Sequence, residues 1–241
     1  MRFFTIRVAN TNIGIAAEFG RAYRAFRDFI VDEKPDFSVQ CSEDDFVHEA
    51  AEIESVYHIN APSDVQLEVF ILLRKISDCL LANHVFLIHG ASIALDGQTY
   101  LFTAPSGTGK TTHILKWLEH CPEAFVVNGD KPFILAPPDG FQPLVCGSPW
   151  AGKENMYTNT MVPLKSIILM ERAENNHIEQ ISFADAFPNL LQQVHRPDDP
   201  KKMRTTLQLM QRLSPAVNFW RFQCNNFKDD CFQVAYSSLH G

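Results

Sequence analysis

Alternating apolar and polar positions predict β-strands in the first forty residues. Three short segments are rich in β-branched and aromatic residues, which favour extended backbone: residues 2–9, 13–19 and 36–41. Ser42 with Asp45 three residues later is then typical of the start of a helix. Residues 1–60 are therefore predicted to form a small α+β N-terminal region.

A longer helix is predicted after Pro62. Ser63 and Gln66 have the spacing of a capping box. Apolar residues then recur at helical spacing and share one face: Val65, Val69, Leu72, Ile76 and Leu80. This helix opens the second predicted domain, residues 61–241.

The rest of the chain alternates strands, turns and helices, which predicts an α/β sandwich. The tight turn at Asp96-Gly97 joins two strands into a predicted hairpin. Strands are predicted over 85–95, 98–102, 123–129, 132–145 (two strands joined at Asp139-Gly140), 165–172 and 217–222. Helices are predicted over 110–120, from about Phe187 to Leu213 and over 227–238, with a polar loop over 146–164.

The hairpin leads into a glycine-rich bend, YLFTAPSGTGKTTHI at residues 100–114, which has the pattern of a P-loop (Walker A motif). Such a loop turns successive N–H groups onto phosphate, and its lysine and hydroxyl reach the outer phosphates and magnesium. Ala104 replaces the leading glycine and adds only a methyl group. The alternative is a turn without a ligand. The predicted phosphate-binding residues are Ser106, Gly107, Thr108, Gly109, Lys110, Thr111 and Thr112.

Four further residues are candidates for chemistry. Asp130 follows an apolar strand about twenty residues after the loop, where P-loop enzymes place a magnesium ligand; otherwise it is a turn residue. His89 is predicted to end a strand, either beside the phosphates or in a structural role. Lys153 suits a phosphoryl group in transfer, and Glu154 can orient or deprotonate a hydroxyl. The alternative for this pair is an ordinary solvated loop.

Composition narrows the class of protein. The 241 residues are 46% hydrophobic and 20% charged, as in ordinary globular proteins. A net charge of -7 without a basic cluster argues against nucleic-acid binding. No segment resembles a leader or approaches about 18 apolar residues, so no membrane partner and a cytoplasmic location are expected. The six cysteines include no CxxC pair and the nine histidines no HExxH, which argues against disulfides and transition-metal sites.

Three segments together carry a family resemblance: IHGASIALDGQTYLFTAPSGTGKTT, VVNGDKPFI and SPWAGKENMYTNTMVPLKSIILMER. Over about residues 85–175 the chain resembles the catalytic domain of HPr kinase/phosphorylase and its smaller relatives, whose P-loop fold is shared with phosphoenolpyruvate carboxykinase. The resemblance implies a β-sandwich core flanked by helices, with ATP and Mg²⁺ as cofactors. It also implies roles for four residues: Lys110 on the β- and γ-phosphates, Thr111 and Asp130 on magnesium, and His89 beside the reacting phosphate.

One position departs from the family pattern. Bifunctional members have two adjacent aspartates, the first serving as base or acid, whereas this chain has Gly129-Asp130 and Asp130 matches the second. Proton removal from an acceptor is then expected from Glu154, which is favoured, from His89, or from no base at all.

The predicted function is ATP-dependent transfer of the γ-phosphoryl group to a hydroxyl of a small molecule or of a serine in a peptide or protein. The alternative is a nucleotide-binding protein that senses ATP or presents a partner without catalysis. A carboxykinase reaction would need a second metal site and an arginine-rich pocket, which the sequence does not show. The acceptor, the physiological nucleotide and the oligomeric state stay open, a homo-oligomer included.

Overall fold

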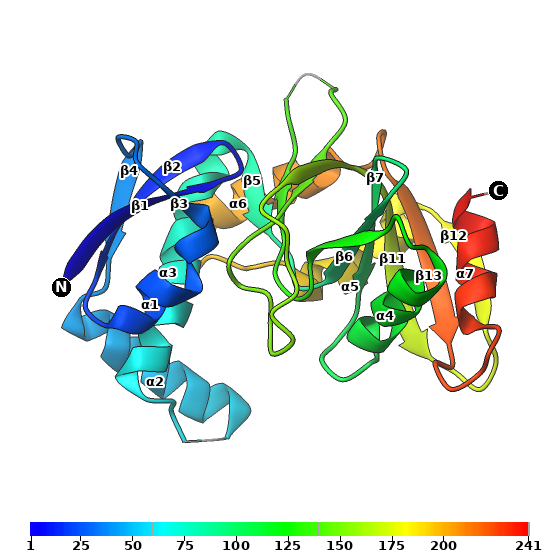
Figure 1. The fold of residues 1–241 in the computed structure, drawn as a ribbon, viewed down its shortest axis with the longest axis horizontal. Helices are drawn as coiled ribbons and strands as arrows, with labels where there is room; N and C mark the ends of the chain where they lie inside the picture. Colours follow the sequence, from blue (N-terminus) through cyan, green and yellow to red (C-terminus); the bar gives the residue numbers. More distant parts are fainter. Residues whose placement is uncertain (59, 139, 241) are drawn as a thin grey trace. The chain divides into compact units, whose positions relative to one another are not determined.

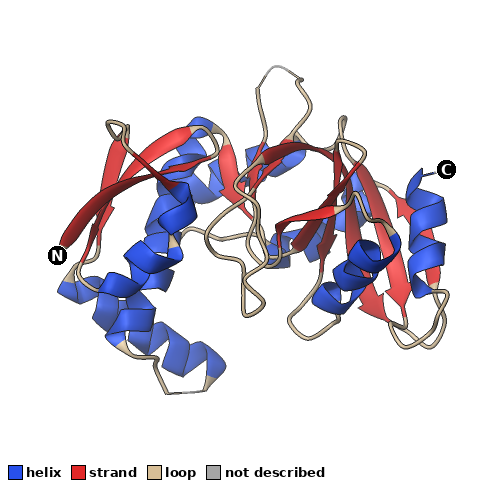
Figure 2. Ribbon diagram, viewed as in Figure 1, coloured by secondary structure: helices blue, strands red, loops and turns tan. Residues whose placement is uncertain are grey.

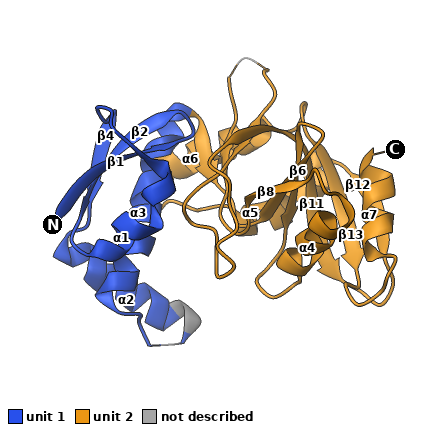
Figure 3. Ribbon diagram, in the orientation of Figure 1, with its two compact units in different colours: residues 1–83 blue, residues 84–241 orange. Residues whose placement is uncertain are grey.

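The computed structural model describes residues 1–58, 60–138 and 140–240 (Figure 1). The chain divides into two compact units, residues 1–83 and residues 84–241 (Figure 3). Both units combine strands with helices, so the mixed α/β class predicted from the sequence is confirmed (Figure 2). Among the described residues, no helix has both the length and the apolar character needed to cross a membrane.

The first unit contains a four-stranded sheet in the order β3-β1-β2-β4. The antiparallel β1–β2 hairpin turns at Ala9 and Asn10, both with positive φ, as a two-residue hairpin turn requires. Strand β4 runs parallel to β2. The strands are β1 (Arg2–Val8), β2 (Thr11–Ala17), β3 (Ile30–Val31) and β4 (Phe37–Gln40). The predicted strands of this region are therefore confirmed.

Among its described residues, this unit also has three α-helices, α1 (Gly20–Ala25), α2 (Glu43–Tyr57) and α3 (Asp64–Leu80), and two short 3-10 helices, Arg27–Phe29 and Leu81–Asn83. The predicted cap of α2 forms a full capping box between Ser42 and Asp45. The predicted box at α3 is wrong, because Ser63 Oγ donates to Gln66 Oε1 at 3.2 Å and caps no backbone N–H. Glu68 of α3 accepts N–H groups after β2, and α3 packs in the first unit, beyond the boundary predicted near residue 60.

The second unit is built on a nine-stranded sheet with the path β5-β9-β10-β11-β7-β6-β8, to which β13 and β12 are added beside β11. The first part of β11 pairs with β10, and its later part runs parallel to both β7 and β13. The strands are β5 (Val85–Leu87), β6 (Ala91–Leu95), β7 (Gln98–Thr103), β8 (Phe125–Asn128), β9 (Phe133–Leu135), β10 (Leu144–Cys146), β11 (Met161–Arg172), β12 (His177–Ile181) and β13 (Asn218–Cys224).

Helices cover both faces of the parallel part of this sheet. Because side chains alternate along a strand, Phe222 and Phe219 of β13 point to opposite faces. Phe222 lies in the core cluster that α4 (Lys110–His120) and α7 (Cys231–His240) share, with Trp117 at its centre. Phe219 contacts Phe183 of α5 (Phe183–Gln193). This packing fixes α4, and the glycine-rich loop before it, against β7.

Two sequence predictions fail in this unit, and one strand was missed. The helix predicted from Phe187 to Leu213 is two helices, because Asp199 caps a new one, α6 (Pro200–Gln211), with proline in its first turn. Strand β12 was not predicted. The turn predicted at Asp139-Gly140 between β9 and β10 lies partly outside the described residues, since Asp139 is not among them.

The second failed prediction concerns residues 85–95, predicted as one strand. The structure has β5 and β6 instead, which pair with different strands. Gly90 lies between β5 and β6. Glycine allows the chain to pass close to β7 there, since a Cβ at this position would lie 2.9 Å from Phe102 O. His89 therefore lies at the break between two strands and not at the end of one.

Candidate functional site

The glycine-rich loop, residues 104–111, lies at the carboxyl edge of three parallel strands. It follows β7, while Arg172 ends β11 and Asn226 comes just after β13. Such ends meet at one edge of a sheet, where α/β proteins bind ligands. Arg172 donates to Gly107 O, and Asn226 Nδ2 donates to Gly109 O at 3.0 Å. Two side chains from distant segments therefore support the loop, and neither was predicted.

The loop backbone needs glycine at two positions. Gly107 has φ of 80° and Gly109 has φ of 112°, in a region that other residues rarely adopt. Thr108 Oγ1 donates to Pro105 O at 2.9 Å and closes the bend. Ala104 has no positive φ, so its methyl group adds no backbone strain. The other predicted loop residues, Ser106, Thr111 and Thr112, are exposed or half-buried on the loop and the first turn of α4.

Alanine at these two glycines should destabilise the fold to different degrees. Both substitutions force a strained backbone that costs about 1–3 kcal/mol. Gly109→Ala should lower the free energy of unfolding more than Gly107→Ala. The methyl group at position 109 would overlap Asn226 Nδ2, whereas nothing lies within 4 Å of a Cβ at Gly107. Urea unfolding of both variants measures the difference. Equal decreases in the free energy of unfolding would show that Asn226 does not restrict the loop backbone at Gly109.

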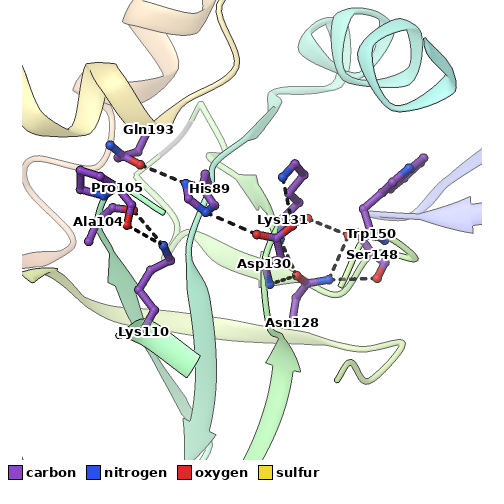
Figure 4. Close-up of polar contacts among 10 residues, drawn as sticks. All are labelled: His89, Ala104, Pro105, Lys110, Asn128, Asp130, Lys131, Ser148, Trp150 and Gln193. Carbon is purple, nitrogen blue, oxygen red and sulfur yellow. Dashed lines mark hydrogen bonds and ion pairs between the residues drawn. The ribbon is translucent and has the colours of Figure 1, made fainter. Parts of the chain in front are cut away.

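Lys110, the charged residue of the loop, is buried, with 7% of its surface exposed. Its Nζ donates to Ala104 O at 2.8 Å and to Pro105 O at 3.3 Å (Figure 4). Burial lowers the pKa of Lys110, the negative charge of Asp130 opposes this, and Lys131 adds to it. The loop therefore holds an ammonium group within electrostatic reach of Asp130.

A buried asparagine fixes the turn that carries Asp130. Asn128 Oδ1, at the end of β8, accepts the N–H groups of Asp130 at 2.9 Å and of Lys131 at 2.7 Å. Its Nδ2 donates to Ser148 O at 2.9 Å. An asparagine that bonds to the backbone two residues on is a turn-forming arrangement. Asn128 was not predicted, although an amide directly before Gly-Asp was the available signal.

The Asp130 carboxylate is shared by two nitrogen donors (Figure 4). His89 Nε2 lies 3.4 Å from Oδ1, and Lys131 Nζ lies 3.0 Å from Oδ2. Burial raises the pKa of Asp130, but the His89 hydrogen bond and the Lys131 charge outweigh it and lower that pKa to about 2. The group is therefore a carboxylate throughout the neutral range. Lys131 was not predicted as a site residue.

His89 is held through both ring nitrogens. Nδ1 lies 3.1 Å from Gln193 Oε1. Nε2 faces the Asp130 carboxylate, with Oδ1 at 3.4 Å, so both ring nitrogens have a partner. The His89 N–H also donates to Gln193 O at 2.7 Å. In this arrangement neither ring nitrogen is free to take a proton from an acceptor.

The loop that carries Lys153 and Glu154 passes beside Asp130. Gly152, with φ of 75°, comes so close that a Cβ there would lie 3.0 Å from Asp130 Cβ. Trp150, buried with its ring 6.2 Å from that of Phe133, anchors the start of this segment. The side chains of Lys153 and Glu154 are exposed. The structure therefore brings this loop to the carboxylate with both side chains accessible.

Gly129 occupies the position where the resembled family has its first aspartate. Its N–H donates to Met156 O at 2.9 Å. A Cβ at this position would lie 3.3 Å from both Ala151 O and Met156 O, which is a tight approach to backbone. The 151–156 segment therefore covers this position, which gives a physical reason for glycine.

The side chains near the loop suit a metal ion that arrives already bound to phosphate. Among the described residues, no group of three or more His, Cys, Asp or Glu side chains could hold a metal ion. Magnesium, however, is usually bound by one or two carboxylates together with substrate phosphates. One carboxylate, Asp130, and one hydroxyl, Thr111, fit that mode.

Asp130→Asn should destabilise the protein by about 2 kcal/mol at pH 7. A carboxyl group with a lowered pKa stabilises the fold above its unfolded value of 3.8, and this contribution disappears as the pH falls through about 2. The difference from the wild type should therefore shrink below about pH 4. Urea unfolding at pH 7 and pH 3 tests this, with the exposed Asp229→Asn as control. A difference independent of pH would contradict it.

Comparisons with known proteins add little to this geometry. The sequence matches no protein-family model and no curated protein. The structure is distantly similar to that of the HPr(Ser) kinase/phosphatase from Coxiella burnetii, with 10% identity and a TM-score of 0.38, covering 63% of this chain and 89% of that chain. A likeness at this level carries no argument about activity, so the functional conclusion depends on the site.

Proposed function

We propose that the protein is an ATP-dependent kinase that transfers the γ-phosphoryl group to a hydroxyl of a small molecule or of a serine in a peptide or protein. The observation that carries the proposal is the position of Lys110. Its buried ammonium group is held by the carbonyls of a glycine-rich loop that opens a helix, within reach of the Asp130 charge. This combination suits the outer phosphates of a nucleotide.

The loop and Asp130 divide the binding of MgATP between them. The N–H groups of residues 106–112 and the positive end of α4 would hold the phosphates. Thr111 and Asp130 would hold Mg²⁺, which when bound neutralises charge on the phosphoryl group. Arg172 and Asn226 keep the loop in its shape, so that the N–H groups are already oriented before the nucleotide arrives.

The 151–154 loop would supply the group that deprotonates the acceptor hydroxyl. His89 has both ring nitrogens engaged, so it would act by positioning Asp130 and not as the base. Glu154 is exposed on a segment beside Asp130 and is the preferred base. Lys153 on the same segment would pair with the phosphoryl oxygens during transfer. A loose transition state demands little activation of the nucleophile, which tolerates glycine at position 129.

An acceptor screen tests this function. ADP formation is measured with wild-type protein and MgATP, alone and with free serine, small alcohols or serine-containing peptides. We expect at least one class of acceptor to raise the rate and to become phosphorylated. ATP binding without acceleration by any acceptor would contradict the kinase proposal.

One observation favours a second candidate, a nucleotide-binding protein without catalysis. Gly129, where the resembled family has its acid or base, is covered by the backbone of residues 151 and 156. A side chain at that position would have to displace these backbone oxygens by a few tenths of an ångström. Slow ATP turnover that no acceptor accelerates would identify this alternative.

A further inference from the structure

Both oxygens of the Asp130 carboxylate are occupied by protein donors. Lys131 Nζ lies 3.0 Å from Oδ2, and His89 Nε2 lies 3.4 Å from Oδ1. A magnesium ion needs its ligands at about 2.0–2.1 Å and keeps near-octahedral geometry. The ammonium group of Lys131 takes one lone pair of Oδ2 and repels the dication. The carboxylate is therefore a weaker ligand for a bare metal ion in this arrangement than it would be without Lys131.

The backbone of Lys131 is fixed, so only its side chain can move away. The Lys131 N–H donates to Asn128 Oδ1 at 2.7 Å, and Lys131 O accepts from Ser148 Oγ at 2.7 Å. The side chain is about one-third exposed, at 32%, which leaves it room to rotate towards solvent or a ligand. Its charge also acts on Lys110, so the two lysines share one electrostatic environment.

We propose that Lys131 controls metal binding at Asp130. Its ammonium group pairs with the Asp130 carboxylate while no nucleotide is present, and it moves away only when a metal arrives bound to phosphate. The phosphate oxygens supply the anions to which the displaced ammonium group can move. Two lysines around one carboxylate give this part of the site an excess of positive charge, which disfavours a bare dication and favours a metal–nucleotide complex. This inference rests on the proposed function for its nucleotide, but not for the effect of Lys131 on metal binding at Asp130.

The effect of Lys131 is tested with Mn²⁺ alone, followed by electron paramagnetic resonance on nucleotide-free protein. Lys131→Gln removes the ammonium group and keeps the backbone contacts. It should bind Mn²⁺ at least about tenfold more tightly than the wild type, the size expected when an adjacent like charge is removed. Lys201→Gln, at an exposed lysine of α6, removes the same charge elsewhere and should leave Mn²⁺ affinity unchanged. Adding Asp130→Asn to Lys131→Gln should abolish the gain.

Equal Mn²⁺ affinity in the wild type and Lys131→Gln would overturn the proposal, as would a gain that survives Asp130→Asn. A second titration, of Mn²⁺ with ATP against the wild type, separates this inference from the proposed function. Tight binding of the Mn²⁺–ATP complex together with weak binding of Mn²⁺ alone supports both the role of Lys131 and the proposed function. If Lys131→Gln gains Mn²⁺ affinity but the protein binds no nucleotide, the kinase function is contradicted, while the effect of Lys131 on metal binding at Asp130 is supported.

Discussion

Lys110→Met is expected to abolish phosphoryl transfer and to weaken MgATP binding severely in a protein that stays folded. The ammonium group is buried on two loop carbonyls, and methionine keeps most of the apolar stem while removing the charge. Loss of a charge aimed at the transferring group should lower kcat by more than about a hundredfold. Calorimetric titration with MgATP and initial-rate measurements test the two effects.

Lys116→Met is the matched control for this variant. It removes the same charge from the same helix, at a position not assigned to the site. The control should retain MgATP binding, and both variants should unfold at temperatures close to that of the wild type. Unchanged nucleotide affinity and transfer in a folded Lys110→Met variant would remove the loop from the proposed site.

Glu154→Gln is expected to lower kcat on the order of a hundredfold while MgATP binding is retained. The exposed carboxylate sits on the loop beside Asp130, whereas the His89 ring is engaged at both nitrogens. His89→Gln should therefore cost less in kcat than Glu154→Gln. Steady-state kinetics of both variants, together with their nucleotide affinities, separate catalysis from binding.

The opposite ranking would reassign the base. If Glu154→Gln kept nearly full activity while His89→Gln lost it, the histidine would take the proton and its contact with Asp130 would orient it. If both variants kept nearly full activity, transfer would proceed without a side-chain base, as a loose transition state allows.

Local patterns in the sequence predicted the parts of the site that local chemistry determines. The positive φ at Gly107 and Gly109, the helix that starts at Lys110 and the hairpin before them depend on residues close in sequence. The same holds for the Ser42 capping box. For these elements, turn and cap chemistry was sufficient to find the structure.

The missed features depend on contacts between distant segments. Residues 85–95 look like one apolar strand, and only pairing of β5 with β9 shows the break at His89. Gln193 meets that histidine from more than a hundred residues away. Arg172 and Asn226 reach the loop because β11 and β13 run parallel beside β7. Lys131 was adjacent to a predicted residue, but nothing local showed that its side chain turns back to Asp130.

The most direct test of the central claim is an amide NMR titration of the ¹⁵N-labelled wild-type protein with MgATP. The claim is that the loop from Ala104 to Thr111 binds the phosphates of a nucleotide. We predict large, saturable shifts of the Gly107, Gly109 and Lys110 amides, weaker with AMP, because the outer phosphates lie on these N–H groups. Binding that leaves these three amides unshifted, or no binding of MgATP at millimolar concentration, would contradict the account.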